Sequence, residues 1–301
     1  MKIITSTTRP LKATPHKACA EDAPTDFFVR LYRNSAGILS YVKGFLCKMT
    51  ENMSADSVQS RQAGFARCCL NNIHYICMHI GGSPVTCYVI NGRNGDLLID
   101  TGFYFCCDRL REWLGQFNIR HILLTHAHVD HDYNAAKLRK LTGAQILLSE
   151  NDVSLIGNYR SQPVKATMKK YRLRNIQQNV CGGMKLFSTR PYSPDIIIKN
   201  QDSGILRSLG YDADIIPLPG HTLGSLGVLA DNVLYCGDAF TAMWGRPDIT
   251  PHATSLKAMR RSLKRILKIS PKWLATGHGL PVSMDKARPV IIKYLKERSR
   301  I

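Results

Sequence analysis

A short histidine-rich segment sets the strongest constraint on what this chain can fold into. THAHVDH, residues 125–131, holds three histidines and one aspartate directly after the apolar run ILL. Side chains two positions apart on an extended chain share a face, so His126 and His128 can offer two imidazoles to one side. Asp130 and His131 follow where the backbone should turn toward a helix that begins near residue 134. Imidazole and carboxylate suit zinc, iron or manganese, so the segment predicts a metal site rather than a histidine-rich turn with no ligand role.

Three further candidate ligands each stand at the end of a predicted strand. His221 lies in PLPGHTLGS, Asp238 in LYCGDAF and His278 in ATGHGLP. Loops at strand ends can direct side chains inward, so these three residues could complete a site with the histidine segment. His121 begins a predicted strand and is expected to be structural.

The order of the predicted elements indicates layered sheets. Short β-rich runs separated by Gly and Asn turns extend from residue 71 to residue 100, and strands then alternate with amphipathic helices such as residues 255–269. This order predicts two sheets covered by helices on their outer faces, an αββα sandwich of the α/β class. Residues 1–68 differ and are predicted to be a helical extension. Within them, the amphipathic, basic residues 27–49 favour a docked helix over one lying on an acidic membrane.

The chain is strongly basic. It has 41 Lys and Arg against 22 Asp and Glu, a formal net charge of +19. The excess includes two runs without an acidic residue, 153–194 and 249–284. Such a charge favours an anionic partner: a small anionic substrate, nucleic acid or an acidic membrane surface. A generally basic surface without a specific partner fits the composition equally well.

No export signal or membrane-spanning run stands out in the sequence. The N-terminal residues lack the apolar centre of a signal peptide, and there is no run of about 18 uninterrupted apolar residues. The expectation is therefore a cytoplasmic protein. Its ten cysteines are expected to stay reduced and to pack as small apolar residues.

Five motifs, in order and in type, resemble those of the metallo-β-lactamase superfamily. They are LLIDTG, THAHVDH, PGHTLGS, CGDA and TGHG, within about residues 70–281. The resemblance implies an αββα sandwich, residues 69–301, with a dinuclear metal site at one edge. The ligands that it implies are His126, His128 and His221 for the first metal, Asp130, His131 and His278 for the second, and Asp238 as a bridge. Asp100 would orient one of these ligands.

The resemblance also implies the chemistry. Two divalent ions about 3.5–4 Å apart would share a water and lower its pKa, and the resulting hydroxide would attack a carbonyl or phosphoryl centre. Asp130 would orient this nucleophile or pass a proton to the leaving group, and Asp238 would hold both ions. Zinc is the favoured metal, with iron or manganese as alternatives.

Departures from the family pattern reduce the number of reactions that the resemblance leaves open. One β-lactamase subclass shares the histidine segment but lacks the bridging aspartate, so Asp238 argues against a dedicated β-lactamase. Lactonases usually carry a tyrosine where this chain has Thr241. Glyoxalase II enzymes continue into a glutathione-binding domain, for which few residues follow His278 here. Tyr133 and Asn134 replace a usual Gly-Gly. The expected reaction is hydrolysis of an ester, thioester or lactone, in the glyoxalase II or lactonase-like branch.

Two other reactions stand as alternatives. A phosphodiesterase or nuclease of the same fold would use the basic runs for phosphate contacts. An iron-dependent member such as a persulfide dioxygenase would carry out redox chemistry instead.

A basic insertion, about residues 155–195, separates His131 from His221. It would either cover an anionic substrate as a lid or lie on the surface as a solvated basic helix. A small, anionic substrate is the expected partner. Nucleic acid and a membrane surface are less favoured, and the oligomeric state is left open.

Overall fold

The structure is a computed structural model that describes residues 66–70, 73–80, 83–103, 106–181, 191–199 and 202–297. The amphipathic segment 27–49 and nearly all of the predicted helical extension lie outside these residues. Strand β1, Ala66–Leu70, runs across the domain boundary placed after residue 68. Because β1 pairs with β2, Ile73–Ile80, the sheet begins slightly before that boundary.

Seven strands form the first sheet, in the order β1-β2-β3-β4-β5-β6-β8. Strands β1 to β4 form an antiparallel meander, and β4, β5, β6 and β8 run parallel. The remaining strands of this sheet are β3 Ser83–Ile90, β4 Asp96–Ile99, β5 Ile119–Leu123, β6 Gln145–Ser149 and β8 Ile196–Ile198. The helices between them are α4 Cys107–Leu114, α5 Val129–Asp132 and α6 Ala135–Thr142. Helix α6 is capped by Gly143, whose φ of 73° suits a residue without a Cβ.

Five strands form the second sheet, in the order β14-β13-β11-β10-β9. They are β9 Asp214–Pro217, β10 Leu226–Ala230, β11 Val233–Gly237, β13 Trp273–Thr276 and β14 Val282–Ser283. Its helices are α8 Ile205–Ser208, before β9, α9 Leu256–Ile269, before β13, and α10 Met284–Glu297, after β14. Strands β11 and β13 run parallel, so the loops after both strands leave the sheet at the same edge.

The two sheets pack against each other through apolar side chains. Leu97 and Leu123 of the first sheet share a fully buried cluster with Val228 of the second. The rings of Tyr88 and Tyr235 cross between the sheets edge to face, with centroids 5.2 Å apart. Burying one such side chain contributes about 1.5–3 kcal/mol, so this layer is a principal source of stability.

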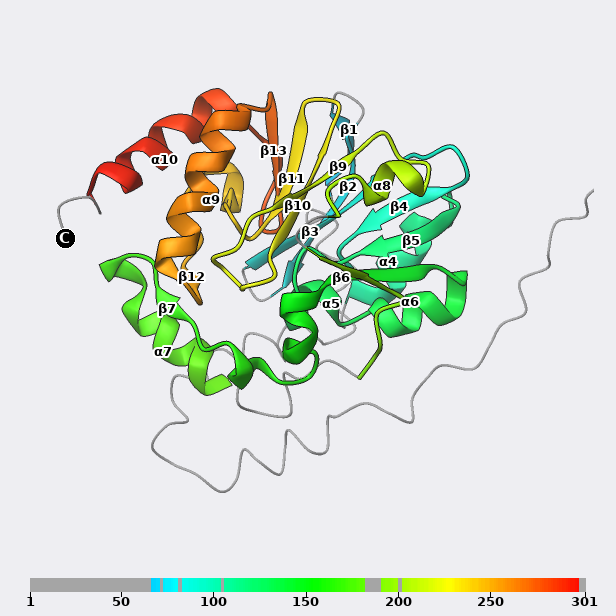
Figure 1. Cartoon of the computed structure of the whole chain (residues 1–301), viewed down its shortest axis with the longest axis horizontal. Helices are drawn as coiled ribbons and strands as arrows, with labels where there is room; N and C mark the ends of the chain where they lie inside the picture. Colours follow the sequence, from blue (N-terminus) through cyan, green and yellow to red (C-terminus); the bar gives the residue numbers. More distant parts are fainter. Residues whose placement is uncertain are drawn as a thin grey trace, which may run out of the picture. The chain divides into compact units, whose positions relative to one another are not determined.

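A second apolar layer lies between the second sheet and helices α9 and α10 (Figure 1). In α9, Met259, Leu263 and Ile266 recur at helical spacing and are fully buried. The helix begins where the Ser255 side chain accepts a hydrogen bond from the Ala258 amide at 3.2 Å. On the other side, α6 contacts β5 and β6 of the first sheet. The predicted αββα sandwich is confirmed.

The basic insertion forms several short elements instead of one continuous helix. They are η4 Tyr159–Ser161, β7 Lys165–Ala166, η5 Lys169–Tyr171 and α7 Arg172–Cys181, and they follow η3 Glu150–Leu155. Strand β7 pairs with β12, His252–Ala253, and η7, Met243–Gly245, precedes β12. On α7, Leu173 and Ile176 are 78% and 61% exposed, so its surface is apolar as well as basic. Among the helices within the described residues, none is long and apolar enough to cross a bilayer.

Candidate metal centre

All seven predicted ligands come together where strands end. His126 and His128 lie just after β5, with Asp130 and His131 in the first turn of α5. The other three ligands follow strands of the second sheet: His221 after β9, Asp238 after β11 and His278 after β13. The site therefore draws its side chains from both sheets.

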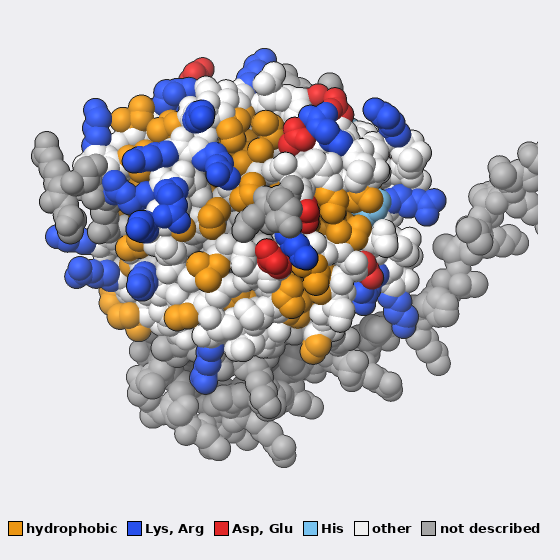
Figure 2. All heavy atoms as spheres, viewed as in Figure 1, with side chains coloured by type: hydrophobic (Ala, Val, Ile, Leu, Met, Phe, Trp, Pro, Cys, Tyr) orange, Lys and Arg blue, Asp and Glu red, His pale blue; other side chains and the backbone are white. Residues whose placement is uncertain are grey.

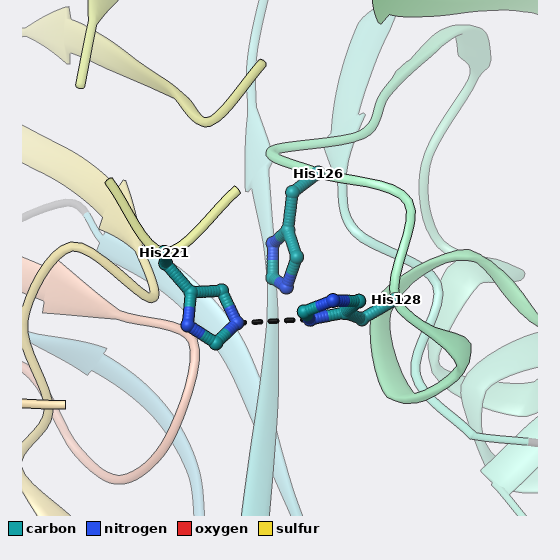
Figure 3. Close-up of side chains that lie close together, drawn as sticks. All are labelled: His126, His128 and His221. Atoms are coloured by element: carbon teal, nitrogen blue, oxygen red, sulfur yellow. Dashed lines mark hydrogen bonds between the residues drawn. The ribbon is translucent and has the colours of Figure 1, made fainter. Parts of the chain in front are cut away.

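The ligand atoms form overlapping groups. In each group, the ligand atoms lie no more than 4.8 Å from one another. The first, called here the three-histidine group, is His126, His128 and His221. Another, called here the mixed group, is Asp130, His131 and His278, and a group of His126, His131 and Asp238 overlaps both. Figure 3 shows the three imidazoles of the first group turned toward one another, with His128 Nδ1 2.9 Å from His221 Nε2.

Asp238 lies between the two groups. Its Oδ2 is 3.4 Å from His221 Nε2 and 3.2 Å from His278 Nε2, while its Oδ1 is 3.5 Å from His131 Nε2. Its side chain is only 6% exposed, so the carboxylate faces the histidines rather than solvent. This position allows one carboxylate to reach ions held by both groups.

Four histidines are anchored through Nδ1, which leaves Nε2 facing the site. His221 Nδ1 lies 2.8 Å from the His252 carbonyl oxygen, and His278 Nδ1 lies 2.7 Å from that of Pro84. An N–H at each Nδ1 makes Nε2 the lone-pair atom, the form of imidazole that binds a metal. His131 and His126 are anchored in the same way, to Asp100 Oδ2 at 2.8 Å and to Thr125 Oγ1 at 3.1 Å respectively.

These donors fit a metal ion. Among the described residues, buried His126 Nε2, His131 Nε2 and Asp238 Oδ1 have no hydrogen-bond partner. Buried polar atoms are rarely left in this state, because each unsatisfied atom costs about 1–3 kcal/mol. Three such atoms directed into one cluster of imidazole and carboxylate groups are explained by a cation bound among them.

The buried histidines differ in the direction of their pKa shifts. Burial lowers the pKa of His128 to about 3 and holds the pKa of His126 well below its ordinary 6.5, so both imidazoles are neutral. Burial also opposes a charge on His131. The carboxylates of Asp100 and Asp130 outweigh that effect and raise the pKa of His131 to about 9.

The carboxylates respond in the complementary direction. Burial by itself would raise the pKa of Asp238, but the charges of His278 and His131 outweigh it and hold that pKa below its ordinary value. Burial likewise opposes a charge on His278, yet Asp238 and Asp130 hold its pKa well above 6.5. Without a metal, protons on His131 and His278 therefore balance the carboxylates, and a divalent cation can replace those protons.

Asp100 supports the site through a strained backbone. Its Oδ2 faces His131 Nδ1, and its two oxygens accept the Thr125 amide and the Thr125 hydroxyl, each at 2.8 Å. Its φ is 60°, a left-handed conformation that is uncommon for a residue with a Cβ. These three hydrogen bonds hold the conformation, which agrees with its expected role of orienting a ligand.

Some contributors to the site could not be read from the sequence. The Pro84 and His252 carbonyl oxygens that anchor His278 and His221 are backbone atoms, and these leave no side-chain signature. Tyr159 of the insertion packs edge to face on His128, with ring centroids 5.6 Å apart. Thr241, where lactonases have a tyrosine, is buried and donates to the His278 carbonyl oxygen at 3.1 Å.

Comparisons with known proteins agree with the fold. The family model described as the metallo-beta-lactamase superfamily matches residues 80–278, which is more than half of the chain. The uncharacterized protein YobT of Bacillus subtilis (strain 168) is 27% identical over 231 residues, which cover 71% of this chain and 91% of YobT. A hydroxyacylglutathione hydrolase of Shewanella pealeana is 30% identical over 160 residues, which cover 53% of this chain but only 44% of that hydrolase.

A solved structure shares the fold. The metallo-beta-lactamase superfamily protein ST1585 from Sulfolobus tokodaii matches with a TM-score of 0.50 and 23% identity, over 71% of this chain and 79% of ST1585. At this identity the likeness concerns the fold alone. The family match, together with the αββα sandwich and the histidine and aspartate groups at its strand ends, shows that this chain belongs to the metallo-beta-lactamase superfamily.

Proposed function

We propose that this protein is a dinuclear metal-dependent hydrolase that cleaves an ester, thioester or lactone. The observation that carries the proposal is the position of Asp238, whose Oδ2 is close to both His221 and His278. The three-histidine group would hold one ion, the mixed group the other, and Asp238 would bridge them. Zinc is the favoured metal, although iron and manganese also suit imidazole and carboxylate ligands.

The chain's own residues would orient the reactants and move the proton. Bound at these groups, two divalent ions would lower the pKa of a coordinated water toward neutrality and polarise the substrate carbonyl. The side chain of Asp130 is 34% exposed against 6% for Asp238, so Asp130 is the carboxylate that a substrate can reach. Its Oδ2 lies 3.3 Å from His278 Nε2, so this carboxylate stands at the edge of the mixed group, where it can orient the attacking water and pass a proton on to the leaving group.

A carbonyl substrate is supported by relatives that are named as hydroxyacylglutathione hydrolases. The similar protein from Shewanella pealeana is named for acting on hydroxyacylglutathione, although this chain spans less than half of its length. Tyr159 adds an aromatic wall from the insertion beside His128. In this proposal the insertion borders the substrate, which is a small molecule with an anionic group.

A phosphodiester is the second candidate substrate, because one face of the protein is strongly basic. Figure 2 shows Lys and Arg side chains gathered over the region of α9 and α10. The exposed basic residues of these helices are Lys257, Arg261, Lys264, Arg265, Lys268, Lys286, Lys293 and Lys296. Their only acidic residues are Asp285 and Glu297. Such a face could contact phosphates.

A paired rate assay tests the proposal. Metal-loaded protein would be given a panel of esters, thioesters and lactones in one arm and a generic phosphodiester in the other. Asp238→Asn removes the shared carboxylate charge, so carbonyl turnover and metal retention should fall at least about tenfold. The control is Asp212→Asn, which alters an exposed carboxylate paired with Arg207.

The two arms separate the candidates. Carbonyl turnover that is lost in Asp238→Asn and kept in Asp212→Asn supports the proposal. Turnover of the phosphodiester alone moves the assignment to a phosphodiesterase. Unchanged metal content and rate in Asp238→Asn would show that Asp238 does not bridge the two ions.

A further inference from the structure

Asp152 is a fully buried carboxylate that the proposed chemistry does not use. It is 0% exposed and lies in η3, directly after β6. Its four hydrogen-bond donors are uncharged, and they come from three separate parts of the chain. Burying a carboxylate with only neutral donors is unfavourable, and burial accordingly raises the pKa of Asp152. A carboxyl group kept in such a place calls for a reason beyond packing.

The donors to Asp152 belong to the two loops that carry the three-histidine group. Asp152 Oδ2 accepts the Thr222 hydroxyl at 2.7 Å, and Oδ1 accepts the Gly224 amide at 2.8 Å, both in the loop after His221. Oδ2 also accepts a longer hydrogen bond, 3.4 Å, from the amide of Ala127. Ala127 stands between His126 and His128. One carboxylate therefore ties together the backbone segments that present all three imidazoles.

Gln162 of the insertion extends this network. Its Nε2 donates to Asp152 Oδ1 at 3.1 Å, and its Oε1 accepts the Leu223 amide at 2.7 Å. The side chain is buried, being 4% exposed. Gln162 thus closes a ring between Asp152 and the His221 loop. Through it, the insertion becomes part of the support of the histidines.

A glycine in the His221 loop makes the contact with Asp152 feasible. A Cβ on Gly224 would lie 2.7 Å from both Cγ and Oδ1 of Asp152, closer than a real Cβ contact allows. Gly224, the second glycine of the motif PGHTLGS, is therefore required by the close approach of Asp152 rather than by an unusual φ. The motif glycine thus leaves the space that the buried Asp152 carboxylate occupies.

We propose that Asp152, assisted by Gln162, is a positioning residue that fixes the geometry of the three-histidine group. The mixed group does not share this support: His131 and His278 are anchored by Asp100 and by the Pro84 carbonyl. Loss of Asp152 should therefore weaken one metal subsite and spare the other. This inference rests on the proposed function, because it assumes that the three-histidine group binds an ion.

Cobalt titration of the full-length, metal-free protein tests the inference. Co²⁺ would be added to wild type, Asp152→Asn and Gln162→Ala while visible absorption and bound metal are measured. His221→Ala and His278→Ala serve as references that identify which spectral component belongs to which group. Asp195→Asn is the matched control, since Asp195 accepts the Ile146 amide at 2.8 Å, away from both groups.

In wild type we expect two bound equivalents. Asp152→Asn should weaken the equivalent whose spectrum is lost in His221→Ala by about tenfold to a hundredfold, and leave the other unchanged. Gln162→Ala should weaken the same equivalent by a smaller factor, and it carries the test if Asp152→Asn fails to fold. Asp195→Asn should bind as wild type.

Other outcomes separate the two proposals. Equal weakening of both equivalents, or of neither, would overturn the positioning role of Asp152 while leaving the dinuclear site intact. A wild type that binds fewer than two equivalents would overturn the proposed function, and the inference with it.

Discussion

At the scale of single residues, the site depends on groups that lie unusually close together. Gly277 shows this most directly, because a Cβ there would lie 2.5 Å from Asp238 Oδ1 and 2.6 Å from His131 Cε1. Its amide donates to the Gly237 carbonyl oxygen at 3.0 Å, so the chain cannot simply move away. The glycine before His278 is thus explained by space needed for two predicted ligands.

Replacing Gly277 by alanine should separate metal binding from folding. The added methyl would push Asp238 or His131 out of position, so we expect metal affinity to fall at least about tenfold. Bound metal after equilibrium dialysis is the measurement. Gly204→Ala is the matched control, because a Cβ there would meet nothing within 4 Å. Equal metal binding by the two variants would contradict the steric account.

At the scale of elements, the insertion is attached through several contacts to residues 248–253, which lie between β11 and α9. Strand β7 pairs with β12, and the Asn175 side chain lies 3.2 Å from His252 Nδ1. Lys170 and Tyr171 both donate to Asp248 Oδ2, at 2.6 and 2.7 Å. Lys170 is thus already paired with a carboxylate of its own chain, which makes it a weak candidate for binding an anionic substrate.

Loss of Asp248 should loosen the insertion without emptying the metal site. Asp248→Ala removes the acceptor shared by Lys170 and Tyr171, so amide hydrogen exchange should rise across residues 165–175. Metal content should stay at the wild-type level, since the hydrogen bonds of the Asp248 side chain within the described residues go to Lys170, Tyr171 and the Ile249 amide. Asp212→Asn, which alters an exposed carboxylate paired with Arg207, should leave the exchange unchanged. Metal loss in Asp248→Ala would show that the β7–β12 contact also supports His221.

At the scale of the whole molecule, the buried cluster ties stability to pH. The pKa of His131 is raised to about 9, so its charged form stabilises the metal-free fold fully below about pH 6.5, and this contribution is lost as the pH rises toward 9. His128, whose pKa is lowered to about 3, acts in the opposite direction: its contribution is present above about 6.5 and is lost as the pH falls toward 3.

The metal-free protein should therefore be most stable near pH 6.5 and should lose stability toward pH 9. Metal binding must displace the protons of His131 and His278, so metal affinity should rise over the same interval. Thermal unfolding of chelator-treated protein, with calorimetry of metal binding in buffers of different ionisation enthalpy, measures both effects. Metal uptake without proton release at pH 7 would contradict the charged state assigned to His131.

The sequence by itself determined the αββα class and placed all seven candidate ligands at strand ends. It could do so because strand and helix periods are local and because the histidine and aspartate motifs are read directly from neighbouring residues. Apart from the role expected of Asp100, only the tertiary structure decided how those ligands are supported. Thr86 donates to the Gly279 carbonyl oxygen across 193 residues of chain, and Asp152 joins the His221 loop across 70. Contacts between distant segments, often made to backbone atoms, leave no local pattern, so they become visible only when the two sheets have packed.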